Sequence, residues 1–248
     1  MQHMQDLTTR LRTPNFEYET AISRVDLGGL SLEIEHLADI DKTIDQLFEH
    51  YLAQGKKDLF EEMCPYFGII WPAARVLAQV VAERETSWRN EWGERPRVLE
   101  LGCGLALPSL VLAARGWSVV ARDLHPDVEY FLARNRSRLP GVDLVFERAD
   151  WQEPRQEAWH LVLASDVLYD RSQPASLARY LATSLKGTLV DSRAGHEPHP
   201  EPGAAMRALV CDPGRGYLDE FISRCRDLGL SVSSEGLFGC RILELRSA

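Results

Sequence analysis

Hydrophobic residues follow two different periods in the first part of the 248-residue chain. Between residues 16 and 37 apolar positions alternate with polar ones on both sides of Gly28 and Gly29, and this period of two predicts a β-hairpin. From residue 40 to 54 the apolar positions instead fall at i, i+3, i+4, i+7 and i+8, with Asp39 or Asp41 as the cap and Gly55 as the end, which is typical of an amphipathic helix. Residues 1–64 are therefore predicted to form an N-terminal extension.

A repeated order of strand, glycine turn and helix characterises the next part of the chain. Pro72 suits the first turn of a helix that runs through Val81, and the polar stretch 83–97 reads as a connection. Beyond it, the pattern predicts strands at residues 97–101, 118–122, 143–148 and 160–164, and helices at residues 109–115 and 127–139. Such alternation is typical of a mostly parallel sheet that is covered by helices on both faces.

The C-terminal part predicts a helix at 216–228 and two strands, 230–233 and 241–245, that pair as an edge hairpin. Two segments, 186–191 and 205–211, resemble a fifth parallel strand. We favour the second, because Asp212-Pro-Gly214 then ends it at the carboxyl edge of the sheet. The predicted fold is α/β: a Rossmann-like, doubly wound, mostly parallel sheet with a C-terminal antiparallel edge hairpin over residues 65–248, preceded by a β-hairpin and helix extension.

Composition and charge narrow the possible partners. The net charge is -9 and no run of Lys and Arg occurs, so nothing would neutralise a phosphate backbone and we expect no nucleic-acid partner. The five cysteines include no C-x-x-C pair, which argues against a disulfide framework and a zinc site. His196 and His199 lie among prolines and glycines, where we expect a solvated loop, and we predict no metal.

The apolar stretches also bear on location. The longest stop near ten residues, well short of the roughly 20 that cross a bilayer, so no membrane span is expected. The N-terminus has neither the basic nor the apolar region of a secretion signal, and a cytoplasmic location is therefore expected.

The strand at 97–101 runs directly into a glycine turn, Gly102-Cys103-Gly104. Glycine allows the tight turn and lets the backbone approach a ligand, while the following helix offers free amides. A dinucleotide-binding turn would carry a third glycine at the position of Leu107, so an NAD or FAD oxidoreductase is disfavoured. The pattern of an acidic residue followed by G-x-G and a small residue, here Glu100 to Ala106, is typical instead of S-adenosylmethionine (SAM) sites.

Acidic residues lie at the end of three successive strands, or just after it, at the same edge of the predicted sheet. Glu100 can accept hydrogen bonds from the cofactor's ammonium group, or alternatively cap the next helix. Asp123, 23 positions later, can hold both hydroxyls of a ribose, although alone it would read as a helix cap. Asp150 and Trp151 place a carboxylate and an indole where an adenine could bond and stack.

Together these residues resemble the seven-β-strand SAM-dependent methyltransferases, in particular the family of protein lysine methyltransferases and nicotinamide-methyltransferase-like relatives. Besides the glycine turn and Asp150-Trp151, the resemblance rests on Pro65-Tyr-Phe-Gly-Ile-Ile-Trp-Pro72 and Ala164-Ser-Asp-Val-Leu-Tyr-Asp170. It implies that the cofactor is SAM, and that Asp166 and Tyr169 line the entrance for the substrate amine. The cofactor residues it implies are Trp71, Glu100, Gly102, Cys103, Gly104, Asp123, Leu124, Asp150, Trp151 and Ser165.

Several readings remain open. The alternative for Trp71 is a core aromatic at a helix start, and the alternative for Asp166 and Tyr169 is that they cap and pack the next helix. Phe67, Ile69 and the loop at residues 193–202 depart from the family pattern. The predicted function is methyl transfer to a protein lysine; the alternatives are a small-molecule N- or O-methyltransferase and an inactive SAM-fold interaction module.

Overall fold

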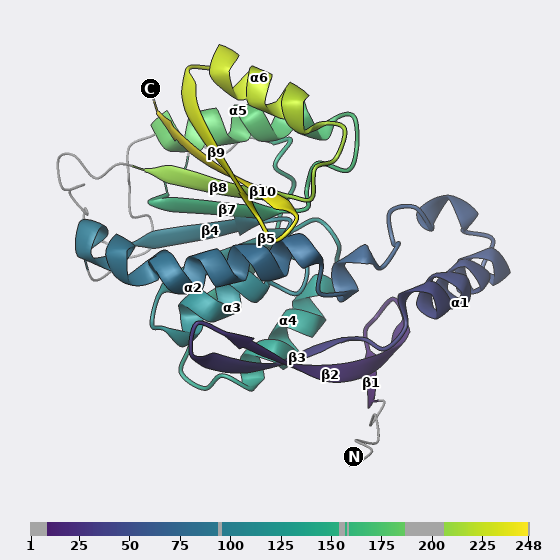
Figure 1. Cartoon of the computed structure of the whole chain (residues 1–248). Helices are drawn as coiled ribbons and strands as arrows, with labels where there is room; N and C mark the ends of the chain where they lie inside the picture. Colours follow the sequence, from purple (N-terminus) through teal and green to yellow (C-terminus); the bar gives the residue numbers. More distant parts are fainter. Residues whose placement is uncertain (1–8, 94–95, 154–156, 158, 187–205, 248) are drawn as a thin grey trace.

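The main sheet has seven strands in the order β6-β5-β4-β7-β8-β10-β9 (Figure 1). The computed structural model describes residues 9–93, 96–153, 157, 159–186 and 206–247. Neighbouring strands from β6 to β8 pair in parallel, whereas β10 is antiparallel to both β8 and β9. The strands are β4 (Arg97–Leu101), β5 (Ser118–Asp123), β6 (Leu144–Arg148), β7 (Leu161–Ser165), β8 (Arg207–Asp212), β9 (Leu230–Leu237) and β10 (Cys240–Ser247).

Helices cover both faces of this sheet. Figure 1 shows α5 and α6 on one side and α2, α3 and α4 on the other. The side chains of β4 alternate between two hydrophobic cores, because successive residues of a strand point to opposite faces. Val98 belongs to the core beneath α2, α3 and α4, and Leu99 belongs to the core beneath α5 and α6. The predicted doubly wound α/β fold is confirmed. The helices are α2 (Pro72–Trp92), α3 (Leu107–Ala114), α4 (Val128–Ser137), α5 (Gln173–Lys186) and α6 (Leu218–Asp227).

Helix α2 is longer than the sequence pattern indicated. The polar stretch from residue 83, predicted to be a connection, continues the helix to Trp92, so that prediction was wrong. Glu85 is buried on the inner face, where it forms a salt bridge with Arg115 at 2.9 Å and accepts a hydrogen bond from Trp117 Nε1 at 3.1 Å. Both partners come from another part of the chain. The local sequence around Glu85 therefore gives no sign that this charged side chain is buried.

In the C-terminal part, the fifth parallel strand lies near residues 205–211, as favoured from the sequence. β8 is the fifth parallel strand, and β9 and β10 pair as a hairpin in which β9 forms the edge of the sheet. Lys186, the first residue of the other candidate strand, is the last residue of α5, whose bounds the sequence pattern did not predict. Residues 187–205, which include the loop at 193–202 with His196 and His199, lie outside the described residues.

A second, smaller sheet stands at the N-terminus. It contains β1 (Thr9–Arg12), β2 (Glu17–Leu27) and β3 (Leu30–Leu37), and α1 (Ile40–Ala53) follows it. The predicted hairpin and helix are confirmed: Leu27 pairs with Leu30 around a two-residue turn, and the Asp39 side chain caps α1. The short helices η1 (Lys57–Leu59) and η2 (Tyr66–Gly68) lead into α2. Strand β1 was not predicted.

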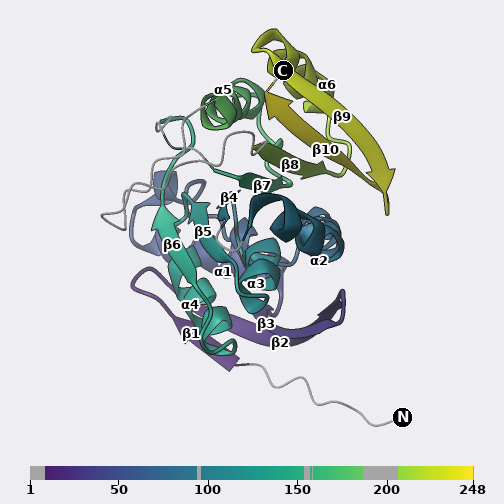
Figure 2. The same ribbon diagram turned by 90° about the vertical axis from the view of Figure 1, so that its left-hand side faces the viewer.

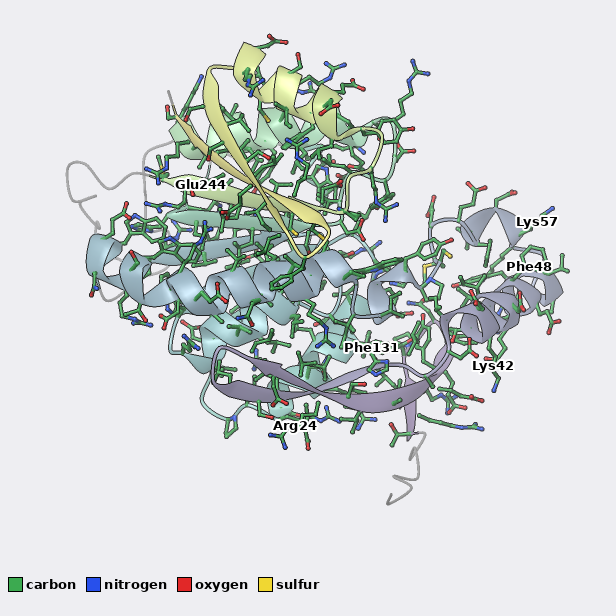
Figure 3. The ribbon with its side chains drawn as sticks, viewed as in Figure 1. Arg24, Lys42, Phe48, Lys57, Phe131 and Glu244 are labelled. Carbon is green, nitrogen blue, oxygen red and sulfur yellow. The ribbon has the colours of Figure 1, made fainter. Side chains whose placement is uncertain are left out.

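The small sheet packs against α4 (Figure 2). Asn135 of α4 accepts a hydrogen bond from the Glu35 backbone N–H at 2.7 Å and donates one to the Glu35 carbonyl at 3.1 Å. Phe131 lies between the two parts, with its ring 5.4 Å from that of Tyr18 (Figure 3). The extension and the main sheet therefore share one continuous hydrophobic core.

Within the described residues, no helix is long and apolar enough to cross a membrane. The same residues contain no group of three or more His, Cys, Asp or Glu side chains that could hold a metal ion. All five cysteines are free thiols.

Candidate functional site

The glycine turn after β4 is tied to the end of β5. Gly102 and Gly104 have φ angles of +59° and +49°, in the left-handed region that favours glycine. The Cys103 N–H donates to the Arg122 carbonyl at 3.0 Å, and the Gly104 N–H donates to Asp123 Oδ2 at 2.9 Å. The structure thus brings together four of the predicted cofactor residues at the carboxyl edge of the sheet.

The same turn is closely packed from two sides. A Cβ atom at Gly102 would lie 2.7 Å from Val167 Cγ1 and 3.3 Å from the ring of Trp151. A Cβ atom at Gly104 would lie 3.0 Å from the Phe67 carbonyl oxygen. A side chain at either glycine would collide with these neighbours and would also strain the backbone. Backbone atoms without side chains therefore line the turn at this edge of the sheet.

Glu100 is fully buried beneath the turn. Its Oε2 accepts hydrogen bonds from the Ser109 N–H, at 3.0 Å, and from the Ser109 hydroxyl, so one oxygen does cap α3. Its Oε1 has no hydrogen-bond partner among the described residues. Burial raises the pKa of Glu100 to about 8, against the hydrogen bonds from Ser109. A buried carboxylate oxygen without a partner fits a ligand that brings an ammonium group.

Asp123 holds the backbone with both of its oxygens. Besides the bond from Gly104, its Oδ1 accepts from the His125 N–H at 3.0 Å, and burial raises the pKa of Asp123. Each carboxylate oxygen can accept a second hydrogen bond, so a ribose diol still finds two acceptors here. Leu124 beside it is 55 % exposed, although its carbonyl is fixed by Arg148 Nε at 2.9 Å.

The loop after β6 carries Asp150 and Trp151. Asp150 Oδ1 accepts from the Gln152 N–H at 2.8 Å, and the Trp151 indole N–H donates to Gln173 Oε1 at 2.9 Å. The Trp151 ring approaches Gly102, which brings an aromatic face to the glycine turn. These two residues and the turn are thus neighbours in space, as the sequence predicted.

Trp71 lies at the N-terminal cap of α2, half-buried, with its indole N–H donating to the Tyr66 carbonyl at 2.9 Å. Phe67, four positions before Trp71 and a departure from the family pattern, is the residue that contacts the glycine turn. The Phe67 ring also lies 4.3 Å from that of His125, centroid to centroid. This loop therefore covers the turn through Phe67, with Trp71 four residues further along.

The end of β7 carries Ser165, Asp166 and, three residues on, Tyr169. Ser165 is buried, and Asp166 adopts a left-handed φ of +57° while its N–H donates to the Cys211 carbonyl at 2.9 Å. Non-glycine residues in this region are uncommon and cluster at functional sites. Tyr169 is 61 % exposed; partial burial raises its pKa, and the carboxylates of Asp123, Asp170 and Asp150 raise it further.

Sequence reasoning missed one charged residue at this end of the sheet. Arg215, in the loop between β8 and α6, donates from Nε to Asp166 Oδ1 at 2.6 Å. The signal in the sequence is the segment Asp212-Pro-Gly-Arg215, which places an arginine directly after the carboxyl end of β8.

A cavity of about 440 Å³ lies to one side of these residues, between the small sheet and the loop before α2. It shares Ile69 and Ile70 with that loop but contains none of the predicted cofactor residues. Its lining residues are Ser23, His36, Leu37, Ala38, Asp39, Ile40, Ile69, Ile70 and Arg75.

An open sheet of five parallel strands with a C-terminal antiparallel hairpin, and a glycine turn after its central strand, is the fold of the SAM-dependent methyltransferases. The structure is similar to magnesium protoporphyrin IX methyltransferase from Synechocystis PCC 6803 with bound SAM, with a TM-score of 0.52 and 15% identity over 83% of this chain and 97% of that one. It is also similar to the ribosomal protein L11 methylase of Lactobacillus delbrueckii subsp. bulgaricus, with a TM-score of 0.50 and 13% identity over 69% of this chain and 77% of that one.

The sequence comparisons place the chain within this class. The profile of the lysine methyltransferase family matches residues 59–190, and the chain belongs to this family. A calmodulin-lysine N-methyltransferase from Arabidopsis thaliana is 26% identical over 171 residues, which are 64% of this chain. The matched part covers 50% of that relative, so the chain spans about half the length of the curated relative it matches.

Proposed function

We propose that the protein is a SAM-dependent methyltransferase that acts on the side-chain amine of a protein lysine. The observation that supports a lysine amine as the methyl acceptor is the position of Asp166, a carboxylate that is 6 % exposed and has a left-handed backbone conformation at the end of β7. The next residue, Val167, packs against Gly102 of the glycine turn. The family match supports the same class of acceptor. The five free thiols are consistent with a reducing compartment, and we propose that the protein acts in the cytoplasm.

Four groups of residues would hold the cofactor. Glu100 Oε1 would accept from its ammonium group, and Asp123 would accept from the ribose hydroxyls, each through a site that the protein leaves open. Asp150 and Trp151 would contact the adenine, while Gly102 lets the backbone approach. The rest of the cofactor site would be formed by Cys103, Gly104, Leu124, Ser165 and Trp71.

When bound, SAM supplies an activated methyl group: the amine lone pair forms the N–C bond as the C–S bond breaks, leaving a neutral thioether and a methylated ammonium whose extra proton passes to water. The protein's part is to align an unprotonated amine with that methyl and to exclude water. Free lysine has a pKa near 10.4, so the amine must lose its proton before it reacts. Asp166 would orient the amine by accepting an N–H, and Tyr169 and Trp71 would flank it.

The test uses the purified protein, tritiated SAM and a cell lysate that is separated afterwards into protein and small molecules. We expect label in a protein band, in an acid-stable form, at a lysine. Asp166→Ala should bind SAM with the wild-type affinity by calorimetry and lose most of the transfer. The matched control is Asp219→Ala, whose side chain is 93% exposed and should leave transfer unchanged.

Three outcomes would overturn this assignment in different ways. Label confined to the small-molecule fraction would assign a metabolite as the acceptor. Failure to bind either SAM or S-adenosylhomocysteine would refute the assignment as an enzyme and favour an interaction module. Full transfer by Asp166→Ala would remove Asp166 from the substrate site.

A further inference from the structure

The carboxylate of Asp166 is already paired with a cation of the chain. Arg215 Nε lies 2.6 Å from Asp166 Oδ1, and the side chains are 37% and 6% exposed, respectively. The Asp166 carboxylate raises the pKa of Arg215 through this hydrogen bond, so the guanidinium stays charged. No described residue donates to Asp166 Oδ2. The ion pair therefore occupies one oxygen and leaves the other for a second partner.

Both members of this pair are anchored to the same strand, β8. The last residue of β8, Asp212, is fully buried, and its Oδ1 accepts from the N–H groups of Gly214 and Arg215, each at 2.7 Å. The Asp166 N–H in turn donates to the carbonyl of Cys211, the preceding residue of β8. The backbone of both residues is thus fixed relative to β8, which places the two side chains next to each other.

A carboxylate alone would hinder the proposed reaction. An anion beside a lysine favours the ammonium form, which has no lone pair with which to attack the methyl. A carboxylate already neutralised by a fixed guanidinium still accepts a hydrogen bond from the amine, but it stabilises the ammonium form less.

We propose that Arg215 is a positioning residue that neutralises Asp166, so that the lysine amine is bound in its unprotonated form. This inference rests on the proposed function, because it takes Asp166 as the group that meets the amine. Arg215 acts through Asp166, and no contact between Arg215 and the substrate is required.

Other titratable groups face Asp166 from β8 and β10. Burial raises the pKa of the Cys211 and Cys240 thiols, which therefore stay neutral. Burial also raises the pKa of Asp212, which contributes either no charge or a negative one. Neither thiol nor Asp212 supplies the positive charge that Arg215 brings.

The experiment compares wild type, Arg215→Gln and Arg215→Lys in two measurements. The first is the affinity for n-butylamine, an analogue of the lysine side chain, measured by NMR titration at pH 7 in the presence of S-adenosylhomocysteine. The second is the rate of label transfer to the protein band of the preceding experiment, at saturating SAM and as a function of pH. Thermal unfolding and S-adenosylhomocysteine affinity verify the fold, and Arg215→Met repeats the series if Arg215→Gln unfolds.

For Arg215→Gln we expect butylammonium to bind about tenfold more tightly and the midpoint of the pH–rate profile to rise by about one unit, because the bound amine keeps its proton. The KM for the substrate should not rise, while kcat at pH 7 falls about tenfold. Arg215→Lys keeps the charge and should remain within about threefold of wild type in both measurements.

An unchanged butylammonium affinity together with an unchanged pH midpoint in Arg215→Gln would overturn the role of Arg215. If Asp166→Ala has meanwhile lost transfer, the proposed function stands without it. A wild-type protein that labels no protein band would instead refute the proposed function itself.

Discussion

Substitution of Glu100 is expected to change the stability of the protein and its affinity for the cofactor in opposite directions above pH 5. The change is Glu100→Gln, which keeps the shape of the side chain and the acceptor for Ser109 but removes the ability to ionise. Burial raises the pKa of this carboxyl from 4.5 to about 8 in the folded protein. The folded state therefore holds a proton that the unfolded chain releases.

The sign of the pH dependence follows from that difference. Because the folded pKa is the higher one, the contribution to stability is fully present below pH 4.5 and is lost as the pH rises toward 8. The whole shift corresponds to about 5 kcal/mol at about 1.4 kcal/mol per unit. Between pH 5 and pH 8 the wild-type protein should lose about 3.5 kcal/mol from this group, and Glu100→Gln should not.

Urea unfolding of the cofactor-free protein, followed by tryptophan fluorescence at pH 5, 6, 7 and 8, measures this difference. The variant and wild type should be closely matched at pH 5, and the variant should be the more stable at pH 8. SAM affinity should fall at least tenfold in the variant, since a neutral amide replaces the anion that would meet the ammonium group. Glu61→Gln, at an exposed position, is the control. Parallel pH dependence in wild type and Glu100→Gln would refute the account of Glu100 as a carboxyl that is protonated when no cofactor is bound.

Two further substitutions test the packing around the site. Gly102→Ala should destabilise the protein by about 1–3 kcal/mol more than Gly116→Ala in urea unfolding, because both glycines have positive φ but only the first would force a Cβ against Val167; equal losses would show that conformation alone accounts for the cost. Tyr18→Phe removes the hydroxyl that donates to Asp127 Oδ2 at 2.7 Å and should cost about 1–3 kcal/mol, since a buried carboxylate loses a donor. An unchanged unfolding midpoint in Tyr18→Phe would show that the hydrogen bond from Tyr18 to Asp127 contributes nothing to stability.

Local patterns were sufficient to predict the main sheet and much of its carboxyl edge. The parallel strands β4, β5, β7 and β8 each contain a short run of buried apolar residues, which is typical of a parallel sheet that is covered on both faces. The closeness of Gly102, Asp123 and Trp151 followed as well, because the carboxyl ends of neighbouring parallel strands meet at one edge.

Tertiary contacts decided what lies outside those patterns. Glu85, in the second half of α2, is buried because Arg115 and Trp117 form hydrogen bonds with its carboxylate from positions about 30 residues further along the chain. Strand β1, which was not predicted, pairs with the edge of β2.

The pairing of Asp166 with Arg215 has the same origin. These residues are 49 positions apart, and they meet because β7 and β8 are neighbours in the sheet and the loop after β8 is held by Asp212. Hydrophobic periodicity reports which residues are buried, whereas the partner of a buried charge depends on the order of the strands, and only the folded structure determines that order.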